Sequence, residues 1–302
     1  METEALATGF VAAAVRVATP LLFASTGETL TERSGVINLG IEGNMLAGAL
    51  AAALGATAWG PWGGLAAAMM AGMLLATVFA LLAIGARADQ IITGTAISLG
   101  AIGLTGTVYR QAYGAEGAGL ELPTFAALPI PLLANIPVLG PAFFAQPIPT
   151  YLAFAGVAVV WWLLFRTRAG LALRATGEGA AMARAVGVRT NLIRTVATVV
   201  GGGFAGLGGA SLVLAQVGTF AERITAGRGF LAIAIVVLGR WHPGGVALAA
   251  LLFGAATALQ FLFQALGVNA PYQLFLMLPY VLILLALGGA VGRVRAPADL
   301  GK

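Results

Sequence analysis

The chain has 302 residues, of which 60% are hydrophobic and 9% are charged. Soluble domains carry about 25% charged residues, so this composition predicts an integral membrane protein. The net charge of +5 does not indicate nucleic-acid binding, because the arginines flank apolar runs and form no basic face with interleaved aromatic residues. Cysteine is absent, which excludes disulfides, thiolate nucleophiles and cysteine-based metal sites. We expect no catalytic residue, no metal and no cofactor.

The first third of the chain alternates apolar runs with short polar segments. Residues 5–24 form the first run, and about 20 residues suffice to span the hydrocarbon core of a bilayer. The polar segment 25–43 is too charged to face lipid, so we expect it to link the first two crossings, with its latter half leading into the second. Further crossings are predicted at 41–59, 65–85 and 91–109.

Two segments in the middle of the chain set the predicted orientation. Residues 110–150 are rich in proline, which forbids a continuous helix, and we expect an extracytoplasmic loop there before a crossing at 151–165. Residues 166–194 follow, and one acid, Glu178, accompanies six arginines in this segment. By the positive-inside rule it is cytoplasmic. The arginines are Arg166, Arg168, Arg174, Arg184, Arg189 and Arg194.

The next crossing, at 195–217, carries a small-residue face. Gly202, Gly206 and Ala210 recur every four residues and therefore share one side of a helix. Such a face lets two helix backbones approach each other closely in a membrane.

The chain ends with one short and two full apolar runs. Residues 229–239 number about eleven, too few to span a bilayer, and predict a half-helix or a tilted, partly buried segment. Full crossings follow at 246–266 and 272–289. The predicted fold is an all-α polytopic bundle of about eight full crossings plus one short helix, with residues 1–302 in one transmembrane domain. Counting back from a cytoplasmic C-terminus places residues 166–194 inside and both residues 110–150 and the N-terminus outside.

Polar residues within the predicted crossings are candidates for a translocation path. Glu42 lies at the start of an apolar run. It is either part of a permeation path or gate, or a structural residue that pairs with Arg33 or with a helix N-terminus. Asn38 and Asn44 flank it and bind either a polar solute or neighbouring backbone. Three further candidates are Thr95, Ser98 and Gln260; for the first two, hydrogen bonding to their own helix is an equal alternative to pore lining.

Residues 178–186 within the arginine-rich segment predict a short, isolated helix. Its alanines favour helix, Glu178 suits the positive N-terminal end, and Gly187 can close it. The residues alone leave two interpretations open, a docking element for a cytoplasmic partner and an ordinary solvated loop. The chain has no Walker A motif, because its lysine is Lys302 at the end of the sequence, so it is not its own ATPase.

Three stretches in the same order resemble the permease subunits of ABC importers of the branched-chain amino acid and simple sugar superfamily. They read TERSGVINLGIEGNML at 31–46, LALRATGEGAAMARAVGV at 171–188 and FAERITAGRGFLAIAIVVLGRWHPGG at 220–245. The likeness is closest to the smaller permease of the nucleoside or simple-sugar branch and covers nearly the whole chain. It implies a type II importer fold in the cytoplasmic membrane of a prokaryote, a transport subunit that is not an enzyme, and a nucleoside or simple sugar as solute.

The same resemblance implies a coupling helix and a set of partners. The residues that match the coupling helix are Glu178, Ala181, Arg184 and Gly187. The implied partners are a separate ATP-binding subunit, a second and larger homologous permease, an extracytoplasmic substrate-binding lipoprotein and membrane lipid, with no nucleic acid. The alternatives are an ion-coupled secondary transporter that uses Glu42, and a channel. Secondary transporters favour interrupted helices in both halves, whereas the short run at 229–239 has no counterpart in the first half; a channel would show a filter or charged ring, and none is evident.

Overall fold

The protein was analysed as a computed structural model that describes residues 2–114, 121–136, 139–265, 273–274, 277, 280–281, 284–285, 288 and 295–302. Most of these residues are helical, and six helices are long and apolar enough to cross a membrane. The predicted count of about eight full crossings is not confirmed. One of those crossings, at 272–289, falls largely outside the described residues.

The elements follow one another with short connections. The long helices are α1 (Glu2–Arg33), α2 (Ile41–Ala80), α3 (Gln90–Tyr113), α5 (Ile148–Arg166), α6 (Arg168–Ala185), α7 (Thr190–Leu212) and α9 (Pro243–Ala265). The short elements are the π-helical segments η1 (Leu81–Gly85) and η3 (Val213–Val217), the 3-10 helix η2 (Leu133–Asn135), α4 (Leu139–Phe144), α8 (Arg228–Leu238) and the strands β1 (Ala127–Pro129) and β2 (Ala145–Pro147).

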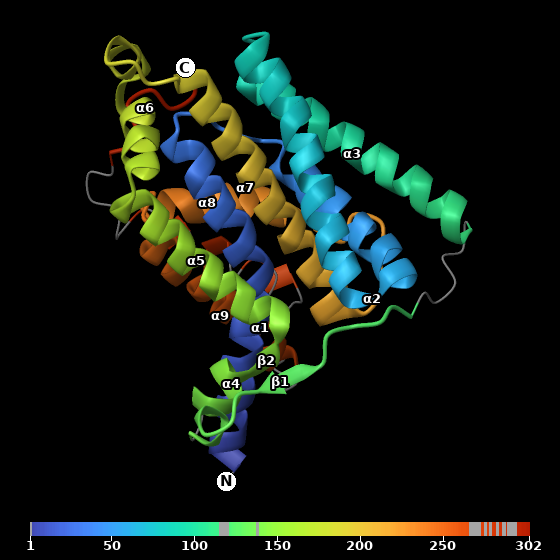
Figure 1. Cartoon of the computed structure of the whole chain (residues 1–302). Coiled ribbons are helices and arrows are strands. Elements are labelled where there is room, and N and C mark those ends of the chain that lie inside the picture. Colours follow the sequence, from blue (N-terminus) through green and yellow to red (C-terminus); the bar gives the residue numbers. More distant parts are fainter. Residues whose placement is uncertain are drawn as a thin grey trace.

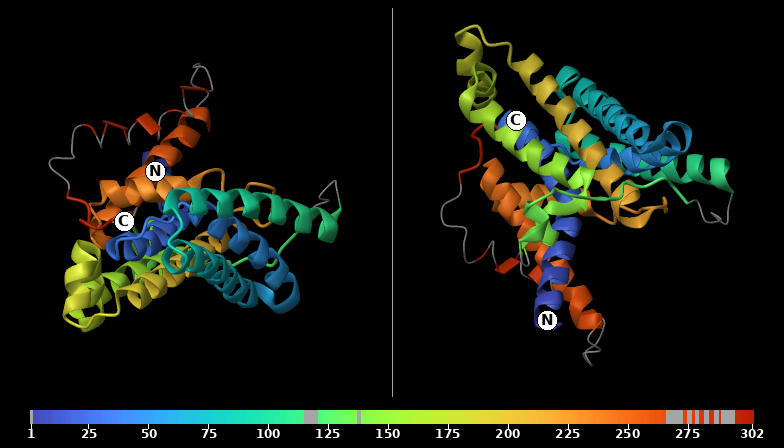
Figure 2. Two further views of the ribbon diagram at one scale, coloured as in Figure 1. Left: turned by 90° about the horizontal axis from the view of Figure 1, so that it is seen from above. Right: turned by 60° about the horizontal axis from the view of Figure 1, so that its bottom comes forward.

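Helices α1 and α7 form the centre of the bundle. α1 packs against α7 and α9, and α7 also packs along α2, while α3 contacts α2 at one edge (Figures 1 and 2). Gly206 explains the close approach of α7 to α2, because a Cβ there would clash with the carbonyl oxygen of Ala68. Gly202 meets Gly72 and Ala76 in the same way. Ala210, the third residue of the predicted small-residue face, is fully buried.

One correction concerns the segment 25–43, which was predicted to link two crossings. α1 instead continues to Arg33, and the linker is confined to residues 34–40. Three hydroxyls of this part of α1, those of Ser25, Thr29 and Thr31, donate to carbonyl oxygens four residues earlier in the helix; Thr29 donates to the Ser25 oxygen at 2.7 Å. A polar stretch therefore remains helical because its side chains bond to the helix itself and are buried against other helices.

The crossings predicted at 41–59 and 65–85 are the two arms of one helical run, Ile41–Gly85. The backbone leaves helical geometry at Trp59 and Gly60, and Gly60 has φ +73°. The two parts then pack on each other, since a Cβ on Gly64 would lie 2.7 Å from the Ala52 carbonyl oxygen. Glycine and the following Pro61 permit the bend. The run is therefore a helical hairpin, and it contributes one of the six helices that are long enough to cross a membrane.

The proline-rich segment contains a short two-stranded sheet, which an all-α fold did not predict. β1 and β2 pair antiparallel, with Leu128 opposite Gln146. Tyr151 fastens this sheet to α5: its hydroxyl donates to the Leu128 carbonyl oxygen at 2.8 Å and accepts from the Gln146 N–H at 3.1 Å. The sheet, α4 and the start of α1 lie at one end of the molecule, and α6 and the C-terminal residues lie at the other, which we call the arginine end (Figure 1).

The short helix predicted at 229–239 is present as α8, with eleven residues. It packs against α1, α2 and α9. A polar turn at 222–227 precedes it. α8 therefore begins and ends inside the bundle, where its N-terminal N–H groups need acceptors from other elements.

Candidate functional site

The Glu42 carboxylate holds the N-terminus of α8. It is 5% exposed, in the first turn of α2. Oε1 accepts from Thr225 Oγ1 at 2.6 Å and from the Gly227 N–H at 2.9 Å, and Oε2 accepts from the Gly229 N–H at 2.7 Å. Gly227 and Gly229 lie on either side of the first residue of α8. A negative charge is favourable there because the partial positive charge of the helix N-terminus faces it.

The two helix starts approach each other so closely that glycine is required between them. A Cβ on Gly229 would meet backbone atoms of Glu42 and its Oε2. The carboxylate therefore lies between the N-termini of α2 and α8 and is favourable for both dipoles. Two structural partners were predicted for Glu42, and the structure pairs it with a helix N-terminus. The other predicted partner, Arg33, donates instead to the Trp241 carbonyl oxygen.

Two buried acids on α1 were not predicted as site residues. Glu28 and Glu32 are each 1% exposed. Glu32 Oε2 accepts from the Trp241 indole N–H, and Arg33 Nε donates to the Trp241 carbonyl oxygen at 2.8 Å. These contacts tie the end of α1 to the turn between α8 and α9. The four-residue spacing of the acids could have revealed them, because it places both on one face of a helix that continues from the first crossing.

The linker between α1 and α2 is fixed by two of the predicted path residues. The Asn38 N–H donates to Glu28 Oε1 at 3.0 Å, and its own Oδ1 accepts from the backbone N–H two residues later at 2.9 Å. Ser98 of α3 donates to the Leu39 carbonyl oxygen at 2.9 Å and accepts from the Gly43 N–H at 3.3 Å. Asn38 and Ser98 therefore surround the same turn that presents Glu42.

The remaining path candidates are dispersed. Asn44 is 1% exposed, lies against Gly202, and neither polar atom of its side chain finds a hydrogen-bond partner within the described part of the chain. Gln260 is 6% exposed and lines a cavity of about 140 Å³ together with Arg228. Thr95 is exposed on α3, and its hydroxyl donates to the carbonyl oxygen four residues earlier at 2.7 Å. Thr95 therefore lies apart from the buried path candidates.

The helix predicted at 178–186 is the last part of a longer helix. α6 begins at Arg168, where the Thr167 hydroxyl accepts from the Gly170 N–H at 3.0 Å, and it is interrupted at Gly179, whose backbone is extended. The predicted short helix is therefore present as the segment after the break at Gly179, and a helical segment that the sequence did not predict precedes it. The Thr167 cap and the leucines and alanines that follow start the helix a full ten residues earlier.

Gly187 ends α6 in a Schellman motif. It has φ +87°, and its N–H donates to the Arg184 carbonyl oxygen at 3.0 Å. The Val188 N–H donates to the Ala183 carbonyl oxygen at 3.0 Å. These are the two bonds that define the motif, and the positive φ explains why glycine occupies this position.

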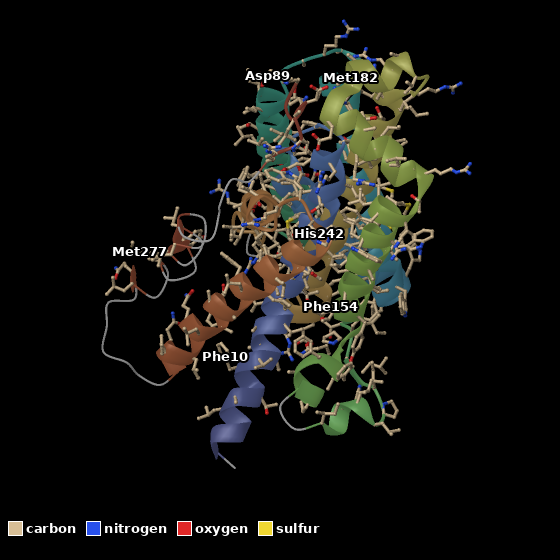
Figure 3. The ribbon with its side chains drawn as sticks, turned by 90° about the vertical axis from the view of Figure 1, so that its left-hand side faces the viewer. Phe10, Asp89, Phe154, Met182, His242 and Met277 are labelled. Carbon is tan, nitrogen blue, oxygen red and sulfur yellow. The ribbon has the colours of Figure 1, made fainter. Side chains whose placement is uncertain are left out.

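The part of α6 after Gly179 exposes apolar side chains at the tip of the arginine end. Met182 is 74% exposed and Val186 is 81% exposed. Figure 3 shows Met182 at this end of the molecule. Ala181, Arg184 and Gly187, which were predicted to couple to an ATPase, are also exposed after this break, and Glu178 is exposed immediately before it.

The C-terminal residues secure α6 from the side. Asp299 Oδ2 accepts from the Ala180 N–H at 2.7 Å, its N–H donates to the Gly177 carbonyl oxygen at 2.9 Å, and the Gly301 N–H donates to the Gly35 carbonyl oxygen at 3.1 Å. The hydrogen bond from Ala180 lowers the pKa of the Asp299 carboxyl below its usual value of 3.8. No sequence motif indicated this contact, which joins residues 119 positions apart.

Long apolar helices with buried polar groups between them define a multi-pass membrane protein. Residues 10–287 match the family model described as branched-chain amino acid transport system / permease component. The chain belongs to this family. It is a permease subunit, and subunits of this kind are not themselves enzymes.

Three relatives cover most of the chain. The guanosine ABC transporter permease protein NupQ of Bacillus subtilis is 38% identical over 303 residues, 96% of this chain and 94% of its own. A Haloferax volcanii protein with the provisional name of a glucose ABC transporter permease is 39% identical over 274 residues, 88% of this chain and 82% of its own. The nucleoside ABC transporter permease protein NupC of Lactococcus lactis is 34% identical over 289 residues, 92% of this chain and 91% of its own. No solved structure matches the chain.

Proposed function

We propose that this chain is a permease subunit of an ATP-driven importer that moves a nucleoside across the cytoplasmic membrane of a prokaryote. The observation that carries the proposal is the end of α6, a short helical segment between Gly179 and Gly187 that exposes Met182 and Val186. Exposed large apolar side chains at the tip of a helix are typical of a surface that docks another protein. The family match supplies the class of partner, an ATP-binding subunit.

The family also implies a substrate-binding protein as a partner. We further propose a second, larger permease beside this one and an extracytoplasmic lipoprotein as the binding protein. The exposed apolar side chains along α3 favour a neighbour in the membrane, either lipid or the second permease. The proline-rich segment and the turn before α8 would then face the binding protein.

A continuous set of contacts supports transmission from α6 to the Glu42 region. Gly177 of α6 lies directly against the Arg33 carbonyl oxygen at the end of α1. The linker that follows α1 holds Asn38, which bonds to Glu28, and leads into the turn of α2 that carries Glu42. Movement of α6 would thus displace the linker and, through Glu42, the start of α8.

Glu42, Asn44 and Gln260 are proposed to contribute polar groups to the translocation path. A buried amide without a partner is costly, and Asn44 has both of its polar side-chain atoms in that state within the described residues. A shift of α8 would free the Glu42 carboxylate and open the small cavity at Gln260 and Arg228. In this proposal the solute takes over hydrogen bonds that the resting protein makes internally or leaves unmade.

A simple sugar is the alternative solute. One observation favours it, the 39% identity to the relative whose name refers to glucose. Two other relatives, at 38% and 34% identity, have names that refer to guanosine and nucleosides. Both classes of solute are small and polar, and the groups near Glu42 can bond to hydroxyls of either.

Uptake in proteoliposomes tests the proposal. The chain is reconstituted with its neighbouring permease, ATPase and binding protein, and labelled nucleosides and sugars are supplied with and without ATP. We expect uptake to require ATP, with a nucleoside preferred over a sugar. The variant Met182→Glu is expected to abolish ATP-driven uptake, because a charge would be buried at the docking surface.

Matched charge reversals on α6 provide the control. Arg184 lies after the break at Gly179 and Arg168 lies before it, and both side chains are exposed. The two variants are Arg184→Glu and Arg168→Glu. We expect Arg184→Glu to impair uptake and Arg168→Glu to leave it near the wild-type rate. Uptake that proceeds without ATPase, driven by an ion gradient, would instead identify a secondary transporter and make Glu42 the residue to pursue.

A further inference from the structure

A cationic cavity of about 480 Å³ lies at the arginine end, beside the proposed coupling segment. Its walls come from the turn between η1 and α3, the first turn of α7 and residues 301–302. Four cationic side chains line it, together with one acid. These residues are Arg87, Arg184, Arg194, Lys302 and Asp89. In Figure 3 Asp89 marks the position of the turn, at the same end of the molecule as Met182.

The acids near the cavity are already engaged by backbone N–H groups. Asp89 caps α3, because its Oδ1 accepts from the Ile92 N–H at 2.9 Å. Asp299 accepts from the Ala180 N–H at 2.7 Å and lies 3.5 Å from Lys302 Nζ. Two side-chain carboxylates, and a third carboxylate where Lys302 is the last residue, therefore face four cations. The Asp89 and Asp299 carboxylates also accept from N–H groups at helix starts. The cavity keeps an excess of positive charge.

Hydrogen bonds to carbonyl oxygens hold two of the guanidinium groups in place. Arg194 Nε donates to the Ser34 oxygen and Nη1 to the Lys302 oxygen, both at 3.2 Å. Arg184 Nε donates to the Ala180 oxygen at 3.3 Å. The Ser34 and Ala180 oxygens orient the two groups without neutralising them, because an amide carbonyl oxygen carries no net charge. An α-carboxylate at Lys302 would neutralise part of the Arg194 charge. The remaining N–H groups can serve an anion in the cavity.

Two helix N-termini add to the positive potential. Gln90, the first residue of α3, and Asn191, in the first turn of α7, both line the cavity. Asp89 satisfies part of the α3 start, whereas the residue before α7 is Arg189, whose side chain provides no cap. The α7 start thus has no side-chain cap, and the partial positive charge of a helix N-terminus favours an anion.

We propose that this cavity binds a phosphate group, either the headgroup of an anionic phospholipid or a soluble phosphate. Arginine forks and a lysine ammonium match phosphate oxygens in geometry and charge, and helix N-termini favour the same ligand. The apolar wall formed by Val36, Ala83 and Ile84 lies at the end of a membrane-spanning run, where a lipid headgroup is within reach. This site is separate from the proposed translocation path and does not depend on which solute is carried.

Two binding measurements on the purified full-length chain test the proposal and separate the sources. In phosphatidylcholine nanodiscs at low ionic strength, calorimetry measures the affinity for inorganic phosphate and pyrophosphate. In detergent, native mass spectrometry measures retention of phosphatidylglycerol against phosphatidylcholine. The variants are Arg87→Asn and Lys302→Gln, with Arg168→Gln as a control that removes the same charge from the same end outside the cavity. Asparagine is chosen because Arg87 has φ +58°, which asparagine tolerates.

We expect Arg87→Asn and Lys302→Gln each to weaken binding by about tenfold or more, the loss associated with one charge-assisted hydrogen bond, and Arg168→Gln to bind as the wild type does. If phosphate binds and phosphatidylglycerol is not retained in preference to phosphatidylcholine, the ligand is a soluble phosphate. If phosphatidylglycerol is retained preferentially and phosphate does not bind, the ligand is a lipid headgroup. The proposal is overturned if neither ligand binds, or if all three variants bind equally. It is also overturned if Arg87→Asn weakens only association with the ATPase, which would mean that an acidic side chain of that subunit fills the cavity.

Discussion

At the scale of single residues, three acidic side chains in this protein act as acceptors for helix starts. Glu42 binds the N-terminus of α8, Asp89 caps α3 and Asp299 accepts from the Ala180 N–H. Glu42 and Asp299 join segments that are distant in the chain, whereas Asp89 caps the helix that follows it directly. Of the three, Glu42 is buried. Because no water reaches the N–H groups of a helix start inside the protein, a carboxylate there removes a large cost.

Replacement of Glu42 should reveal this role. Glu42→Gln exchanges one acceptor oxygen for an amide N–H₂ that faces backbone donors, so we expect a loss of stability of about 3 kcal/mol. Glu222→Gln is the matched control, because Glu222 forms an exposed ion pair with Arg110 at 3.2 Å and should contribute less than about 1 kcal/mol. Denaturation midpoints and hydrogen exchange at Gly227 and Gly229 measure the difference. Equal midpoints for the two variants would contradict the assigned role.

A glycine pair tests the close packing of α7. Gly206→Ala places a methyl group against the Ala68 carbonyl oxygen and should destabilise the protein by about 1–3 kcal/mol. Gly103→Ala on α3 meets no atom within 4 Å and should be neutral or stabilising by up to about 1 kcal/mol, from helix propensity alone. Thermal denaturation in one detergent compares them. A destabilisation by Gly103→Ala as large as that by Gly206→Ala would show that the effect is not due to packing.

At the scale of elements, the arginine end is assembled from pieces that the sequence keeps apart. α6 is bounded by Thr167 and Gly187, while its interruption at Gly179 is secured by residues 295–302 through Asp299. The linker after α1 contacts the same C-terminal residues at Gly35 and Gly301. If α6 moves, the linker after α1 and the C-terminal residues must therefore move with it.

The Asp299 contact predicts a pH dependence. Because the folded protein lowers the pKa of this carboxyl below 3.8, its stabilising contribution is complete above that value and is lost as the pH falls through the lower folded value. Docking of the C-terminal residues should thus be constant at neutral and mildly acidic pH. Asp299→Ala should release them at every pH. Limited proteolysis of residues 295–302 in a pH series measures this, and release of the wild-type segment between pH 5 and pH 7 would contradict it.

At the scale of the whole molecule, orientation follows from the distribution of arginine. The arginine end gathers α6, the turn at 86–90 and the C-terminal residues, and the proline-rich segment lies at the other end. These two ends were predicted to face opposite sides of the membrane. The positive-inside rule predicts that the arginine end faces the cytoplasm.

The absence of cysteine makes this orientation directly testable. Single variants Glu121→Cys and Ala181→Cys place one thiol in the proline-rich segment and one on α6, both at exposed positions. In intact spheroplasts a membrane-impermeant maleimide should label Glu121→Cys and not Ala181→Cys. In inverted vesicles the pattern should reverse. Labelling of both from one side would refute the predicted topology.

Much of the fold and part of the candidate site could be read from the sequence. Apolar runs predicted the membrane class and the positions of most helices, and the length of 229–239 predicted a short helix. The spacing of Gly202 and Gly206 predicted a face that does pack closely in the structure. These features were accessible because length, hydrophobicity and helical period are local properties of a chain.

Tertiary structure decided what the polar residues contact. The segment 25–33 became part of α1, the acceptor Glu42 met α8, and Asp299 met α6, although no pattern in the sequence links these partners. The physical reason is that a polar group inside a membrane is stable only beside a complementary group. Which group lies beside it depends on how distant helices pack, and a local sequence pattern does not contain that information.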